Sequence, residues 1–156
     1  MIATAFAVAF VVYSCKSGLS EAGKLDLSAT PLQIVDSMNM VQTNKGKIEM
    51  RVVTGQMQRF DNDSVSREYF PEGMWVYAYT DDEVLESTIV SDEASHEKRK
   101  DSGEEIWKAF GNVVVKNIVK QQTMETDTIY WDRTKKEIYT DCYVRMYSPD
   151  GFMQGY

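Results

Sequence analysis

The sequence predicts an all-β domain made of repeated antiparallel hairpins, and three observations carry this prediction. Apolar and polar residues alternate along several segments with a period of two, which is the period of a strand with one covered face. Thr, Val, Ile and aromatic residues are concentrated between residues 47 and 147, whereas long helical runs of Ala, Leu and Glu are missing. Related hairpin patterns also recur along the chain at a spacing of roughly 35 residues.

The two upstream hairpins consist of alternating segments separated by polar turns. In the first, alternation over residues 48–52 is followed by the turn-forming residues 61–64 and by the alternating segment 74–79. In the second, residues 86–95 lead through a polar stretch to residues 106–112. The chain has 156 residues, which is enough for one domain with a buried core.

The third hairpin, from Gly111 to Asp141, has the clearest pattern. The apolar run Val113–Val115 indicates a strand that is covered on both faces, and the charged residues 132–136 form the expected turn. Alternation resumes after the turn, which predicts one continuous returning strand. Its apolar or nearly apolar face consists of Ile138, Thr140, Cys142, Val144 and Met146.

Residues 1–15 have the composition of an export signal or a membrane anchor. Residues 2–13 are apolar or small apart from one threonine, a length that is short for a transmembrane helix but suits the core of a signal peptide. Ser14 before Cys15 resembles the cleavage site of bacterial lipoproteins, in which the cysteine is lipidated. Three interpretations stay open: a lipoprotein signal, an uncleaved anchor helix and an ordinary secretory signal. Each places the folded domain outside the cytoplasm.

A spacer is expected after this segment. Small polar residues interspersed with Gly18, Gly23 and Pro31 predict flexible chain over residues 16–37. The β-domain is then expected to span residues 38–156.

Charge and reactive side chains argue against several function classes. A formal net charge of −7 disfavours nucleic acid and anionic membrane surfaces as electrostatic partners. The single histidine, His96, has no neighbouring serine or cysteine nucleophile, and the chain contains too few His and Cys residues for a zinc-type site. Carboxylates such as Asp61 and Asp63 lack the spacing of a calcium loop. We therefore expect neither an enzyme nor a cofactor.

The remaining functional signal is the amount of apolar and aromatic surface on the expected strands. Aromatic residues such as Trp75, Trp107 and Trp131 are expected to form a rim. A second, mostly aliphatic set is expected to line an interior, and it comprises Met50, Val52, Val76, Ile89, Phe110, Val113, Val115, Ile138 and Val144. Two interpretations stay open for this set: the filled core of a β-sandwich, or an open apolar groove that takes acyl chains.

Several strand and turn motifs are specific enough to indicate a family. They are Phe70-Pro71-Glu72-Gly73, Trp107 to Val115, Glu125-Thr126-Asp127, Tyr130-Trp131-Asp132, Ile138-Tyr139-Thr140-Asp141 and Ser148-Pro149-Asp150-Gly151. With these motifs, residues 47–156 resemble the LptC family of periplasmic proteins of lipopolysaccharide export. The family usually continues beyond the point that corresponds to Tyr156, so its last strands have no counterpart here.

The resemblance implies a twisted, open β-jellyroll that transports lipid. Such a protein accepts lipopolysaccharide from an inner-membrane ABC transporter and passes it along a hydrophobic groove to a periplasmic bridge protein of the same fold. It is periplasmic and tethered to the inner membrane. The alternative is an envelope lipoprotein whose β-sandwich binds a protein partner or a small apolar ligand. A groove that runs the length of the sheet, with unpaired edges at both ends, would favour transport.

Overall fold

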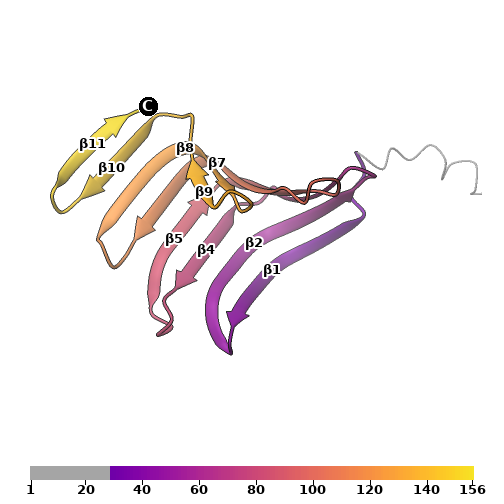
Figure 1. Ribbon diagram of the computed structural model, residues 1–156, viewed down its shortest axis with the longest axis horizontal. Coiled ribbons are helices and arrows are strands. Elements are labelled where there is room, and N and C mark those ends of the chain that lie inside the picture. The colour runs from indigo at the N-terminus through magenta and orange to yellow at the C-terminus, as the bar shows by residue number, and fades with distance from the viewer. Residues whose placement is uncertain (1–28) are drawn as a thin grey trace, which may run out of the picture.

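The computed structural model describes residues 29–156, which form a single antiparallel sheet of eleven strands (Figure 1). The strands are β1 (Gln33–Asn44), β2 (Lys47–Asp61), β3 (Val65–Phe70), β4 (Met74–Tyr79), β5 (Leu85–Ser91), β6 (Glu93–Arg99), β7 (Glu105–Asn117), β8 (Gln122–Asp132), β9 (Glu137–Tyr139), β10 (Val144–Ser148) and β11 (Gly151–Gly155). The all-β, open antiparallel fold predicted from the sequence is confirmed. Residues 29–156 contain no helix that is long and apolar enough to cross a membrane.

The amino-terminal part of the sheet begins earlier than the sequence indicates. β1 starts at Gln33, inside the range 16–37 that is expected to be a spacer, because residues 33–36 pair with residues 56–59 of β2. The expected signal or anchor segment 1–15, including Cys15, lies outside the described residues.

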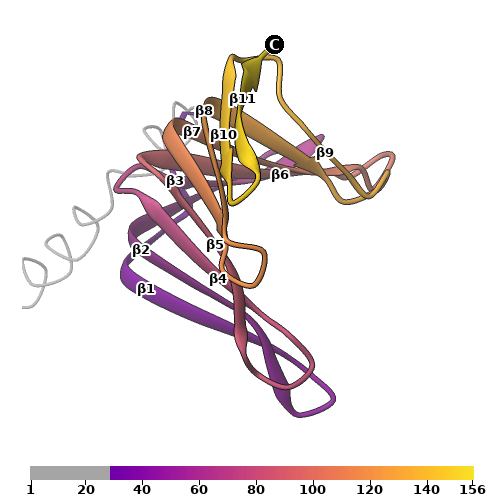
Figure 2. The ribbon, with the colours of Figure 1, turned by 90° about the vertical axis from the view of Figure 1, so that its left-hand side faces the viewer.

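The sheet is folded into two layers that diverge from a common line (Figure 2). The long strands β2, β7 and β8 cross this line. On one side they pair with β3, β6 and β9, and we call this part layer A. On the other side they pair with β4, β5 and β10, which together with β11 and most of β1 form layer B.

The backbone leaves the strand conformation where it crosses the fold line. Ser37, Gly73, Gly111 and Asn112 all have positive φ angles there, of 54°, 77°, 75° and 48°. In β7, the register against β8 shifts between Phe110 and Val113 around the last two of these residues. Such irregularities bend a strand and increase its local twist, so they explain why one sheet forms two layers.

The prediction of one continuous strand after residue 136 is wrong, because the chain leaves the strand conformation at the fold line. The predicted turn is confirmed between β8 and β9, but residues 140–143 separate β9 from β10. Extending the Tyr130–Tyr139 register would place Glu125 opposite Val144, whereas Glu125 pairs with Arg145, so one additional residue is inserted. The Thr140 hydroxyl donates to the Thr128 carbonyl and accepts from the Cys142 amide, which holds this bend.

The buried core lies between the layers, close to the fold line. Small residues on layer A allow the layers to approach each other there, since Ala94 of β6 and Ala109 of β7 are direct cross-strand partners and both are buried. The buried apolar residues are Val52, Met57, Phe70, Met74, Ala94, Ala109, Val113 and Ile129.

Gly111→Ala is expected to destabilise the protein by about 2 kcal/mol, because a non-glycine residue at positive φ costs about 1–2 kcal/mol and this site is also crowded. An added Cβ would lie 3.0 Å from Asp92 Cβ and 3.1 Å from Asp92 Oδ2. Gly103→Ala is the matched control, since φ is +70° there and nothing lies within 4 Å. Urea denaturation should give the smaller loss for Gly103→Ala, and equal losses would contradict a crowded fold line.

Candidate lipid-binding groove

The inner face of layer B carries an unbroken row of apolar side chains. Residues directly opposite each other in neighbouring antiparallel strands share a face and lie about 5 Å apart. From β1 to β11, the successive partners are Met40, Val52, Val76, Ile89, Val115, Met124, Met146 and Met153. We call this set the apolar row. It crosses every strand of layer B at right angles to the chain direction.

The apolar row is open at both sheet edges. Within residues 29–156, β1 pairs only with β2 and β11 pairs only with β10, so each of these strands has a side that no described strand occupies. The terminal residues of the row are correspondingly accessible, with exposed fractions of 37% for Met40 and 65% for Met153. A long apolar molecule that lay on the row could therefore extend beyond the sheet at either end.

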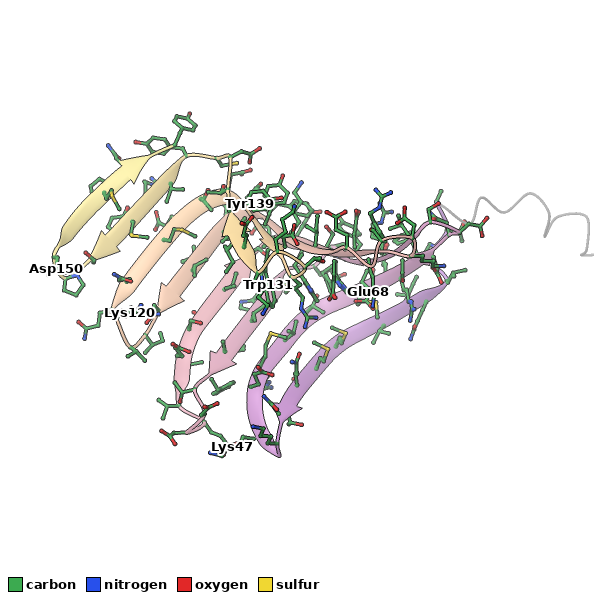
Figure 3. All side chains as sticks on the ribbon, in the orientation of Figure 1. Lys47, Glu68, Lys120, Trp131, Tyr139 and Asp150 are labelled. Carbon is green, nitrogen blue, oxygen red and sulfur yellow. The ribbon has the colours of Figure 1, made fainter. Side chains whose placement is uncertain are left out.

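Layer A supplies the opposite wall. Trp107 on β7, Trp131 on β8 and Ile138 on β9 follow one another as direct partners on its inner face. Figure 3 labels Trp131 in the β8–β9 hairpin, and Trp131 and Ile138 of this hairpin line the space that faces layer B. An apolar groove lies between the layers, and it is lined by Met50, Val52, Met74, Val76, Ile89, Trp107, Lys108, Ala109, Ile129, Trp131 and Ile138.

A more polar row borders the apolar row on its side away from the fold line. It consists of Gln42, Met50, Ala78, Ser87, Asn117 and Gln122, again as direct cross-strand partners. Amide and hydroxyl groups of this row thus lie on the same face as the apolar row, two residues away along each strand. The groove has an apolar floor and a hydrogen-bonding margin, an arrangement that suits an amphipathic ligand.

The structure brings together five of the residues that the sequence assigns to the interior. Met50, Val52, Val76, Ile89 and Ile138 all line the groove. The tryptophans Trp107 and Trp131, which the sequence assigns to a rim, are part of its wall. Strand alternation places each on the same face as another groove residue, Ala109 or Ile129, but the sequence does not show that this face turns toward layer B.

The other four predicted residues lie elsewhere. Val115 belongs to the apolar row, and Val113 is fully buried at the fold line. Val144 is half-buried on β10, two residues from Met146 and on the same face, but it is not among the residues around the groove. Phe110 lies on the opposite face of β7, because it alternates with the groove residue Ala109, and its ring is 5.0 Å from Lys108 Nζ.

A charged cluster surrounds His96 on the inner face of layer A. The His96 ring stacks on Trp107, with 4.3 Å between centroids. Its Nδ1 lies 3.1 Å from Glu68 Oε2, and its Nε2 lies 3.0 Å from Glu105 Oε1. Glu105 also accepts a bond of 2.8 Å from Arg133 Nη1. The cluster therefore holds the Trp107 ring in place from beside it on the same face.

Both carboxylates of this cluster are stabilised in their ionised form. The hydrogen bond from His96 holds the pKa of Glu68 below its usual value, although burial acts in the opposite direction. Burial also acts to raise the pKa of Glu105, but Arg133 and His96 together outweigh it, so that pKa is lowered too. The negative charge of both groups thus contributes to the stability of the folded state.

Acid should weaken the fold through these two groups. A carboxyl whose pKa is lower in the folded than in the unfolded state contributes stability above its unfolded pKa of 4.5, and this contribution is lost as the pH falls through the lower folded value. The free energy of unfolding should therefore decrease from pH 5 downward. Glu68→Gln should reduce that slope, whereas the exposed Glu97→Gln should not. Parallel urea titrations of both variants would measure the difference, and equal slopes would contradict a stabilising role for Glu68.

A scan of protein-family models finds no match to the chain, and a search of curated proteins finds none either. The function is therefore argued from the groove and from the motifs described above.

Proposed function

We propose that this protein carries the acyl chains of lipopolysaccharide in the groove between its layers, as an LptC-like component of the export system. In this role it accepts lipopolysaccharide from an inner-membrane ABC transporter and passes it to a periplasmic bridge protein of the same fold. The domain then lies in the periplasm, tethered to the inner membrane by its amino-terminal segment. The observation that carries the proposal is the apolar row, which crosses layer B from one unpaired edge to the other.

The dimensions of the row suit a sliding acyl chain. Seven steps between eight neighbouring strands give a path of about 34 Å at roughly 4.8 Å per step. Burial of an acyl chain is worth about 0.8 kcal/mol per methylene, so a chain of about twelve carbons contributes on the order of 10 kcal/mol. A closed pocket of that strength would release its ligand slowly. An open row allows the chain to move on without leaving apolar surface.

The unpaired edges support a hand-over between proteins. A strand from a partner sheet can pair with the free side of β1 or β11 and continue the sheet. Because the apolar row ends at Met40 and Met153 on these two strands, such pairing would also continue the row. The alternative function, a binding module for a protein partner or a small apolar ligand, has no need of a row that is open at both ends.

Site-specific photo-crosslinking in cells with an active exporter tests the proposal. A crosslinking residue at Val76 or Ile138 should give lipopolysaccharide adducts, because both side chains line the groove. The matched controls are Tyr77 and Tyr139, the next residues along the same strands, whose side chains face the other way. No adducts at Val76 and Ile138, with adducts present on the transporter, would refute the groove assignment. Adducts to protein alone would favour the alternative function.

A further inference from the structure

All eight methionines of residues 29–156 are on one face of the folded sheet. Four belong to the apolar row, at Met40, Met124, Met146 and Met153. The other four are Met38, Met50, Met57 and Met74, which either line the groove or pack on the buried core. The outer face of layer B, by contrast, carries no methionine: the outer row next to the apolar row consists of Val41, Arg51, Tyr77, Thr88, Lys116, Thr123, Tyr147 and Phe152.

Strand formation does not explain this placement. Strands favour β-branched and aromatic residues, and such residues make up six of the eight members of the outer row. Within the apolar row, β-branched residues occupy the centre, at Val52, Val76, Ile89 and Val115, while methionines occupy both ends. Three consecutive methionines, on β8, β10 and β11, form the end next to the β11 edge.

Methionine and β-branched residues differ most in how they adapt to a ligand. Methionine is unbranched, has three rotatable bonds and a polarisable thioether, and fills irregular gaps. Valine and isoleucine are stiff at χ1. The centre of the apolar row therefore has a fixed shape, whereas its ends can be remodelled around whatever lies on them. The high exposure of Met153 leaves its side chain free to do so.

We propose that the methionines at the β11 end of the apolar row make this ligand path tolerant of acyl-chain shape, so that straight saturated chains and bent unsaturated chains bind with similar affinity. This inference rests on the proposed function and specifies its ligand class. A lining of β-branched residues over the same three strands would accept one chain shape and disfavour the other. The methionines Met124, Met146 and Met153 are the specificity-determining residues in this account.

Calorimetric titration of the purified full chain with palmitate and palmitoleate tests the inference, because the two fatty acids differ only by one cis double bond. The wild-type dissociation constants should agree within about threefold. The triple variant Met124→Ile, Met146→Ile, Met153→Ile should separate them by about tenfold or more. The matched control is Thr123→Ile, Tyr147→Ile, Phe152→Ile, which changes the directly paired residues of the outer face on the same three strands.

The outcomes separate this inference from the function on which it rests. Binding of neither fatty acid by the wild-type chain would refute the acyl-binding function itself. Binding of both, with an unchanged ratio in the methionine variant, would overturn only the role of the methionines. The same loss of tolerance in the outer-face control would overturn it as well, because the effect would then come from altered strands rather than from the lining.

Discussion

Ile89→Asp should lower the affinity of the protein for palmitate by about a hundredfold, which corresponds to about 2.7 kcal/mol. Ile89 lies in the middle of the apolar row, directly between Val76 and Val115. An acyl chain on the row would cover the new carboxylate, and an ionised group that loses its water without gaining a partner is strongly disfavoured. Calorimetric titration measures the affinity, and circular dichroism confirms that the variant keeps its strands.

Thr88→Asp is the matched control for this prediction. Thr88 precedes Ile89 on β5 and faces the other side of the sheet, between Tyr77 and Lys116. The same new charge there should leave palmitate binding unchanged. Ile138→Asp provides a second test on the opposite wall, at a residue exposed enough to accept a charge without loss of the fold. Equal affinities for Ile89→Asp, Ile138→Asp and Thr88→Asp would contradict a ligand path through the groove.

Local periodicity was sufficient to predict the strands themselves. The alternation of residues 74–79 corresponds to β4, and the charged residues 132–136 correspond to the turn between β8 and β9. Both signals depend on contacts between near neighbours in the sequence, such as turn chemistry and the two faces of one strand. This is why the all-β fold and its hairpins were accessible without a structure.

The position of the fold line cannot be predicted from the sequence, because it depends on contacts between strands that are distant in the sequence. Ser37 adopts positive φ although serine rarely does so, and its residue type therefore does not predict a bend. The break after Tyr139 depends on a hydrogen bond from Thr140 to Thr128, on another strand. Alternation alone continues through this region and predicts a single straight strand.

The sequence predicts only part of the candidate site, because local alternation identifies residues on regular strands but not the way the two layers face each other. Val76 and Ile89 were recognisable because each alternates within a short, regular strand. The sequence assigns Trp107 and Trp131 of the opposing wall to a rim, because they become groove residues only when layer A folds back over layer B. Phe110 illustrates the opposite error, since its apolar character suggested the interior although its strand turns it outward.

Phe70→Ala should lower the free energy of unfolding by about 3–5 kcal/mol, the usual cost of removing a fully buried aromatic ring. Phe70 is 1% exposed at the end of β3, directly opposite Ala94. Its ring also stacks on Trp107, with 6.0 Å between centroids and 14° between planes. Ala94 is too small to fill the cavity that alanine would leave at position 70. Urea denaturation of the full chain measures the loss.

Phe60→Ala distinguishes this specific role from the general effect of removing a phenylalanine. Phe60 lies on the outer face of β2, half-buried, with Arg67 Cζ 4.7 Å from its ring centroid. Its removal leaves no enclosed cavity and should cost only about 1 kcal/mol. Phe70→Ala should additionally weaken palmitate binding, because Trp107 loses the ring that supports it from the fold line. A Phe70→Ala variant with unchanged palmitate affinity would mean that the His96 cluster alone positions Trp107, and that the wall of the groove is independent of the core beneath it.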